Sequence, residues 1–327
     1  MVAHFSRFAR FHSRARLGVA AAVVLIGAAA PAADPPAAAS VYRRAPRASQ
    51  PGELSEAESQ AERIVTGALL AFDRTDSLSA RVRQKARIGD RVLTGPGRYV
   101  QSGAGEERRY RFESRLECTS TLDRPESFEL VEVCDGLFAW GYRRTAYEPP
   151  ALSRIDVRRV RDRLEQLQPT DQGTAARYLG GLQRSLWNVR EWFRFVSAEP
   201  ADLDGTSVWL VDGRWDAEKL AALLPDIAEA ARRPEGVEPA DLPDGVPWSV
   251  RLWIGRGDLL PRRIEWLAVP GKRPVAASAP EPIAVLDLLD IEVGGRIDAA
   301  NFFYKPAGVG LMDVTEQHVK TLRMWRP

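Results

Sequence analysis

Hydrophobic and polar residues alternate along two stretches of this chain. From Leu78 to Ile88 the even positions are mostly apolar, while the odd positions carry serine, arginine and lysine. From Tyr110 to Cys118 the even positions are again mostly apolar, and the odd positions hold arginine and glutamate. Because successive side chains of a strand point to opposite faces, this period of two predicts antiparallel strands with one dry and one wet face. The apolar face of such a sheet must be covered by helices, a second sheet or a ligand.

Helical periodicity marks several segments around these strands. Ser55 and Glu58 predict a capping box, and apolar residues then recur at three- and four-residue steps as far as Phe72, so we expect this helix to lie on the sheet. Further helices are predicted from Asp156, over 174–193 and over 216–232. Strands are predicted at 78–88, 91–101, 107–118, 127–134, 137–143, 194–199, 206–212, 248–255, 261–269 and 282–293. The fold class is therefore α+β, with loop excursions at 233–247 and 270–282.

The N-terminus predicts export. Four arginines without an acid precede an uncharged run from Leu17 to Ala30 and the triplet Ala30–Ala32, which is the layout of a signal peptide over 1–32. An Ala- and Pro-rich leader is expected over 33–52 and a single domain over 53–327, with a helical insert around 152–193.

Four of the 46 basic residues leave with the signal and none of the 44 acidic ones does, so the mature chain is slightly acidic. That balance does not favour nucleic-acid binding.

The order of a leading helix, a long meander and a few covering helices resembles the LolA-like superfamily of periplasmic lipoprotein carriers. Four short segments carry the resemblance: Ser79–Gln84, Thr94–Tyr99 (TGPGRY), Asp135–Trp140 (DGLFAW) and Ala300–Val309. The resemblance implies a curved antiparallel sheet forming an incomplete (half) β-barrel, helices over its mouth and an apolar concavity that receives acyl chains. This chain departs from the family in its size, its helical insert and its two excursions.

Aromatic and aliphatic side chains in phase along the strands are candidates for the walls of that cavity. They are Tyr110, Phe112, Phe138, Trp140, Trp248, Val250, Leu252, Ile254, Ile264 and Trp266. Trp187 and Trp192 on the middle helix are candidates for a lid, or simply pack that helix down. Ordinary core packing is the alternative for the whole set, because periodicity does not distinguish a filled core from a hollow one.

Little in the mature chain indicates catalysis. Its single histidine, His318, is expected at the surface, which disfavours histidine triads and multi-histidine zinc sites. Phosphate loops and dinucleotide glycine patterns are absent from the sequence. The odd spacing of Asp287 and Asp290 predicts opposite faces of a strand, and Glu265 is expected to face water. We therefore predict no enzyme activity, no cofactor and no metal.

Two cysteines remain after export, Cys118 and Cys134, each at the end of a predicted strand. In an oxidising compartment they can pair across neighbouring strands, and a disulfide is predicted over the alternative of two free core thiols. The Cys-x-x-Cys spacing of redox sites is absent.

The sequence thus predicts an exported, soluble periplasmic carrier that binds a lipid or the acyl chains of a lipoprotein, with transient membrane contact. The alternative is a cell-envelope sensor or scaffold module of the same fold that binds a protein partner. The arginine-rich face, 81–87 and 109–115, either docks anionic groups or is a solvated outer face balanced by Glu113 and Glu117.

Overall fold

The computed structural model describes residues 54–88, 91–118, 127–145, 148–167, 176–233, 237–238, 241–268, 282–305 and 308–324. The predicted signal peptide and leader lie outside these residues. The strands are β1 (Ser77–Ile88), β2 (Arg91–Ser102), β3 (Arg109–Cys118), β4 (Ser127–Cys134), β5 (Phe138–Arg144), β6 (Ala151–Asp156), β7 (Phe193–Leu203), β8 (Thr206–Trp215), β9 (Ser249–Gly255), β10 (Pro261–Leu267), β11 (Pro282–Val293) and β12 (Leu311–Asp313). The α-helices are α2 (Glu56–Arg74), α3 (Val157–Leu167), α4 (Ala176–Leu179), α5 (Gly181–Trp192), α6 (Ala217–Leu223), α7 (Ala228–Ala231) and α8 (Thr315–Met324). Short 3-10 turns lie at η1 (Gly105–Glu107), η2 (Pro225–Ile227) and η3 (Ala299–Phe302).

All twelve strands belong to one sheet, in the order β12-β6-β5-β4-β3-β2-β1-β11-β10-β9-β8-β7. Strands β1 to β6 form one antiparallel meander and β7 to β11 form another, and the antiparallel pair β1 and β11 joins the two. The short strand β12 adds to β6 in parallel. The sheet therefore ends at two edges, β12 and β7, and does not close into a barrel. This confirms the predicted α+β class with an open, curved antiparallel sheet under helices.

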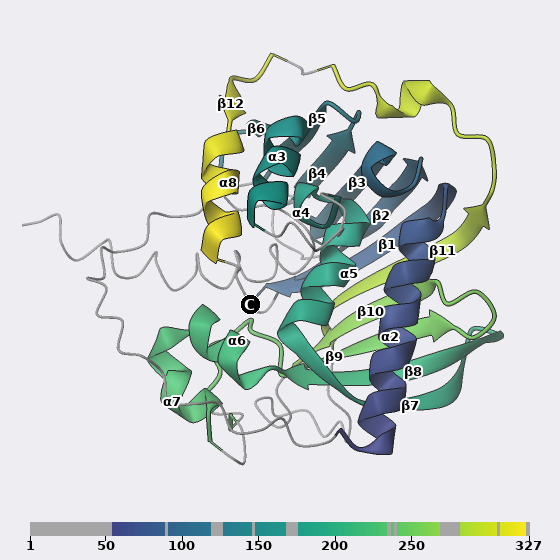
Figure 1. Ribbon diagram of the computed structural model, residues 1–327, viewed down its shortest axis with the longest axis vertical. Helices are drawn as coiled ribbons and strands as arrows, with labels where there is room; N and C mark the ends of the chain where they lie inside the picture. Colours follow the sequence, from purple (N-terminus) through teal and green to yellow (C-terminus); the bar gives the residue numbers. More distant parts are fainter. Residues whose placement is uncertain are drawn as a thin grey trace, which may run out of the picture.

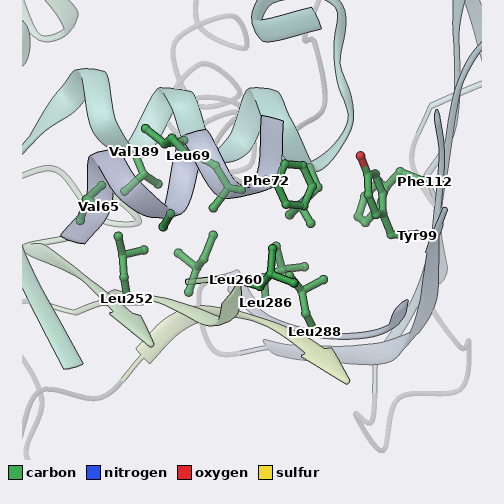
Figure 2. Close-up of a cluster of buried hydrophobic side chains, with 14 of the residues drawn as sticks. Val65, Leu69, Phe72, Tyr99, Phe112, Val189, Leu252, Leu260, Leu286 and Leu288 are labelled. Carbon is green, nitrogen blue, oxygen red and sulfur yellow. The ribbon is translucent and has the colours of Figure 1, made fainter. Parts of the chain in front are cut away.

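Two glycines of β2 lie close to the backbone of β3. Cβ atoms at Gly95 and Gly97 would lie only 1.8 and 2.3 Å from the carbonyl oxygens of Arg115 and Glu113. Glycine is thus required where β2 crowds the backbone of β3, and Pro96 between them offers no amide hydrogen to the ladder. Figure 2 shows that the sheet is curved: Tyr99 and Phe112 lie on its upright wall, while Leu286 and Leu288 lie on its floor.

The alternation that predicts β1 and β3 is confirmed in the burial of their side chains. Along β1, Leu78, Ala80, Val82 and Ala86 are buried on the concave side, while Arg81 and Arg83 are exposed on the other side. The predicted strand bounds agree with the observed ones within a few residues, except that β6 and β12 are additional strands. Both are short, and neither has a run of alternating residues long enough to mark it.

Helix α2 begins as predicted at Ser55. The Ser55 hydroxyl accepts from the amide of Glu58, and the Glu58 carboxylate accepts from the amide of Ser55 at 2.9 Å, which completes the capping box. Its apolar face, with Ala61, Val65 and Phe72, packs on the concave side of the sheet (Figures 1 and 2). Among the described residues, no helix combines the length and apolar character needed to cross a membrane.

Two predicted helices are interrupted. The helix expected over 174–193 splits into α4 and α5 because Gly180 and Gly181 adopt positive φ angles of 136° and 69°. The helix expected over 216–232 begins at the predicted cap Asp216, whose carboxylate accepts from the amides of Glu218 and Lys219. It then breaks at Pro225 into η2 and α7, because proline cannot donate the next helical hydrogen bond.

The predicted disulfide is wrong. Both cysteines are free, Cys134 buried and Cys118 half-buried. In the register of β3 against β4, Cys134 lies opposite Tyr110, which is eight residues along β3 from Cys118. At about 3.3 Å per residue this separates the two cysteines by about 26 Å, far beyond the few ångströms that a disulfide spans.

His318 also differs from its predicted position. It lies on α8, a helix the sequence patterns do not predict, and it is half-buried rather than at the open surface. Burial, together with the positive charge of Arg184, lowers the pKa of His318 to about 4.

Candidate functional site

The concave face of the sheet forms one apolar surface contributed by both meanders. Seven of the ten predicted cavity residues lie on it and are at most 4% exposed. They are Tyr110 and Phe112 on β3, Val250, Leu252 and Ile254 on β9, and Ile264 and Trp266 on β10. Cross-strand register explains why they meet: Ile264 lies opposite Leu252 and also opposite Leu286. These residues belong to the same buried cluster as the side chains of the covering helices.

Helices α2 and α5 cover this face (Figure 1). Val65, Leu69 and Phe72 of α2 and Val189 of α5 point toward Leu252, Leu260 and Leu286 of the sheet (Figure 2). Of the two predicted lid residues, Trp187 is half-buried against the cluster, whereas Trp192 is buried at the end of α5. The Trp192 ring stacks on Trp215 of β8 with centroids 6.1 Å apart. Helices α2 and α5 thus cover this part of the face, with Trp192 fixing one end of α5, while Val160 of α3, Leu179 of α4 and Leu322 of α8 belong to the same buried cluster.

Phe138 and Trp140 lie on the opposite, convex face of the sheet. The register of Tyr110, Cys134, Ala139 and Ile155 places these four residues on the concave side, so the neighbouring positions on β5 face outward. There Arg154 lies 4.7 Å from the centroid of the Phe138 ring, and Tyr304 packs on Trp140 at 6.0 Å. The structure thus does not bring Phe138 and Trp140 together with the other predicted cavity residues.

Trp248 lies outside the main cluster as well. It precedes β9 and packs in a second, smaller cluster with Leu220 of α6, Ala231 of α7 and Leu242. Its amide donates to the carbonyl of Leu267 at 2.8 Å, which continues the ladder between β9 and β10. Trp248 therefore secures the α6 and α7 region and not the face under α2 and α5.

Buried polar side chains hold the C-terminal end of α2. Arg108 is 3% exposed and donates from Nη2 to the carbonyl of Asp73 at 2.6 Å, while its Nη1 lies 3.3 Å from the Asp73 carboxylate. Gln101 of β2 donates to the carbonyl of Thr75 at 2.7 Å and accepts from the Tyr99 hydroxyl at 2.8 Å. These bonds satisfy carbonyls that the end of a helix leaves free. Gln183 of α5 donates to the Asp73 carboxylate, which links the two covering helices.

Glu132 of β4 holds the N-terminal end of α5. Its side chain is buried, and its carboxylate accepts from the amide of Gly181 at 2.6 Å. Burial raises the pKa of Glu132 to about 7, although the Gly181 hydrogen bond and the positive charge of Arg184 act in the opposite direction. Gly181 must be glycine, because a Cβ there would lie 2.8 Å from the Tyr110 ring. The alternating patterns single out none of these polar residues, since Gln101 and Glu132 simply occupy buried strand positions and their partners come from distant helices and loops.

Charged side chains on the convex face form several ion pairs. A β-bulge between β1 and β11 sets three residues of β1, Ser79 to Arg81, against four of β11, Leu289 to Glu292, and Asp290 there adopts a positive φ. The bulge overturns the expected opposite faces of the two aspartates, because Asp290 pairs with Arg81 and Asp287 with Arg83 on the same convex face.

Glu265 lies on this convex face but is 9% exposed rather than open to water, with its carboxylate 3.6 Å from Arg263. Ion pairs also join Arg111 to Glu113 and Arg115 to Glu117, as the balanced outer face predicts. The acids of this region are thus held by arginines. In the part of the chain that the structure describes, no three histidine, cysteine or acidic side chains gather as metal ligands.

Comparisons with known proteins return solved structures only. No family model matches the chain, and no curated protein matches it. The complex of MucA and MucB from Pseudomonas aeruginosa is 11% identical with a TM-score of 0.36, over 75% of this chain and 61% of that one. The chain thus spans about three fifths of the MucB structure it matches.

Two further structures are similar over nearly their whole length. LprF from Mycobacterium bovis is 10% identical with a TM-score of 0.35, over 78% of this chain and 100% of that one. A LolA superfamily protein from Nitrosomonas europaea is 14% identical with a TM-score of 0.24, over 75% of this chain and 97% of that one. The predicted resemblance to the LolA-like superfamily is found again among these structures, and identities and scores this low say nothing about ligand or partner.

Proposed function

We propose that this protein is an exported, non-catalytic carrier that binds a lipid or the acyl chains of a lipoprotein on the concave face of its sheet. The observation that supports this function is the composition of that face, which is apolar across both meanders and is covered by helices alone. When an acyl chain takes the place of α2 or α5 side chains, the apolar face of the sheet contacts the acyl chain and loses its contacts with those side chains. Each buried methylene then contributes about 0.8 kcal/mol, so a long chain binds with little polar recognition.

The attachment of the covering helices supports a cover that opens. Hydrogen bonds hold the C-terminal end of α2 through Arg108 and the N-terminal end of α5 through Glu132. Between these ends, the central side chains of α2, such as Val65 and Leu69, touch the sheet through apolar contacts. Apolar contacts are not directional, so α2 pivoting about its C-terminal end breaks one ion pair along its length, between Glu62 and Arg190 of α5 at 3.0 Å, and otherwise exchanges apolar contacts. An acyl chain enters the space that such a motion opens.

Binding of an acyl probe to a matched pair of variants tests this function. Leu252→Asn places an amide on the concave face, whereas Leu242→Asn makes the same change in the second cluster, where Leu242 is equally buried. We expect Leu252→Asn to weaken binding of a fluorescent fatty acid at least about tenfold and Leu242→Asn to leave it within about twofold. Circular dichroism establishes that each variant is folded. A folded Leu252→Asn variant with undiminished affinity would contradict the assignment of the site.

A second function, a cell-envelope module that binds a protein partner, is favoured by a different observation. Large apolar side chains lie exposed on and around the half of the sheet that ends at β12: Met312 of the edge strand β12 is 58% exposed, Leu137 before β5 is 71% exposed and Phe303 after η3 is 74% exposed. An exposed edge strand with apolar neighbours suits an added strand from another chain. A protein partner that copurifies with the chain when no lipid is present supports this alternative over the carrier.

A further inference from the structure

Two hydrogen-bond donors are buried on the concave face without an acceptor. Gln84 of β1 is 1% exposed and Trp266 of β10 is 0% exposed. Within the described residues, neither Nε2 of Gln84 nor the indole Nε1 of Trp266 has a hydrogen-bond partner. The carbonyl oxygen of the Gln84 side chain accepts from the Ser114 hydroxyl, so the amide nitrogen keeps both of its hydrogens free.

The register of the sheet brings the two donors onto one part of this face. Ala86 lies opposite Ala284, Ala284 lies opposite Trp266, and Gln84 is two residues from Ala86 on β1. The two donors are therefore two strands and one two-residue step apart, which separates their backbones by about 12 Å. On β11, which lies between them, Leu286 is opposite Gln84 and Ala284 is opposite Trp266. The two side chains that carry a free N–H thus lie on the same face of three neighbouring strands.

Neither donor is needed for a packed core. Methionine has nearly the volume of glutamine, and phenylalanine offers a smaller aromatic ring in place of the indole, and neither carries an N–H that needs an acceptor. Other polar groups buried near this face do have partners: the Tyr99 hydroxyl bonds to Gln101, and Glu132 accepts from Gly181. Nε of Arg108 and Oε1 of Gln183 have none among the described residues, but both side chains bond through another atom. A buried donor without an acceptor opposes folding, so two of them on one face indicate a place where an acceptor arrives with a ligand.

We propose that Gln84 and Trp266 form a polar subsite that binds the carbonyl oxygen of an ester- or amide-linked acyl chain. This inference rests on the proposed function and deepens it, since it names the chemical group that positions the ligand. Both donors are neutral, and they therefore suit a neutral carbonyl oxygen and require no anion. The hydrocarbon part of the ligand lies along the apolar remainder of the concave face, beside Leu286 and Ile264.

A pair of lipids that differ only in their carbonyl groups tests the subsite. Dipalmitoylglycerol carries two ester carbonyls, and dihexadecylglycerol has ether linkages in their place on chains of equal length. We expect the full-length protein to bind the ester lipid about tenfold more tightly than the ether lipid in a fluorescent fatty-acid displacement assay. A triacylated cysteine peptide, used as a third probe, distinguishes a lipoprotein ligand from a free lipid, because tighter binding of one of them identifies the source of the acyl chain.

Three variants show whether the two donors cause the preference. Gln84→Met and Trp266→Phe each remove the free N–H while keeping an apolar side chain of similar size, and each should bring the ester and ether lipids within about threefold of one another. Trp253→Phe is the matched control, because the Trp253 indole also has no partner among the described residues but lies on the convex face against Arg263. The control should retain the full ester preference. Two different substitutions are tested so that failure of one to fold leaves the other informative.

The outcomes separate the subsite from the carrier function. If the wild-type protein binds both lipids equally well, or if both Gln84→Met and Trp266→Phe retain the ester preference, the subsite is wrong and the carrier function stands. If neither lipid binds at all, the carrier function and the subsite fall together.

Discussion

At the scale of single residues, buried polar side chains determine where the covering helices are fixed. Arg108 and Gln101 bind carbonyls at the end of α2, and Glu132 binds the first amide of α5. The alternation along β2 and β4 predicts the face on which Gln101 and Glu132 lie, because every second residue shares that face, whereas Arg108 lies at the end of η1. Their partners come from helices distant in the sequence, and a periodic pattern carries no information about such contacts.

Removal of the Glu132 charge should change how stability depends on pH. Burial raises the pKa of Glu132 to about 7 from 4.5, so the folded protein holds this proton more tightly than the unfolded chain, and stability falls as pH rises between those values. Glu132→Gln keeps an acceptor for the Gly181 amide but has no charge. We expect the difference in the free energy of unfolding between the variant and wild type to rise by about 2 kcal/mol in favour of the variant from pH 5 to pH 8, as measured by urea unfolding.

His318 also makes the stability of the protein depend on pH, so the variant must be compared with wild type at each pH. Its pKa is lowered to about 4, so the unfolded chain binds the proton more tightly and stability rises with pH up to its ordinary value of 6.5, opposite in sign to Glu132. Glu129→Gln is the control, since Glu129 lies on the same strand but on the convex face, paired with Arg144. An equal stability difference between Glu132→Gln and wild type at both pH values would show that Glu132 does not titrate as described.

At the scale of elements, strand alternation predicts most of the sheet, and the exceptions have local causes. The two glycines 180 and 181 end the expected long helix because they adopt left-handed backbone, which the apolar spacing around them does not reveal. Phe138 and Trp140 alternate as well as any core pair, yet η3 and the residues that follow it bring Tyr304 onto their convex face. Periodicity shows that two residues share a face and does not show which face is concave.

Gly181→Ala should destabilise the start of α5 more than left-handed backbone alone explains. The added Cβ would meet the Tyr110 ring at 2.8 Å, in a backbone with φ of 69°. Gly205→Ala is the matched control, because Gly205 has φ of 83° and nothing within 4 Å of the added Cβ. We expect a loss of about 1 kcal/mol for Gly205→Ala and of about 3 kcal/mol for Gly181→Ala in urea unfolding. Equal losses would mean that Tyr110 yields to the added methyl group.

At the scale of the whole molecule, two meanders meet at the pair β1 and β11 and share one concave face under α2 and α5. The sequence predicts the fold class and seven residues of that face, because apolar phase along a strand survives into the structure. It does not predict the bulge at Asp290 or the distance between Cys118 and Cys134, since both depend on strand register. The register also sets which two donors, Gln84 and Trp266, share the floor of the face.

The most direct test of the carrier function is native mass spectrometry of the full-length protein purified from the envelope fraction of its own host, followed by solvent extraction of anything released. We expect a lipid or lipopeptide bound in stoichiometric amount, with ester- or amide-linked acyl chains. A protein that is empty after purification and takes up no added lipid or lipopeptide would contradict the carrier function.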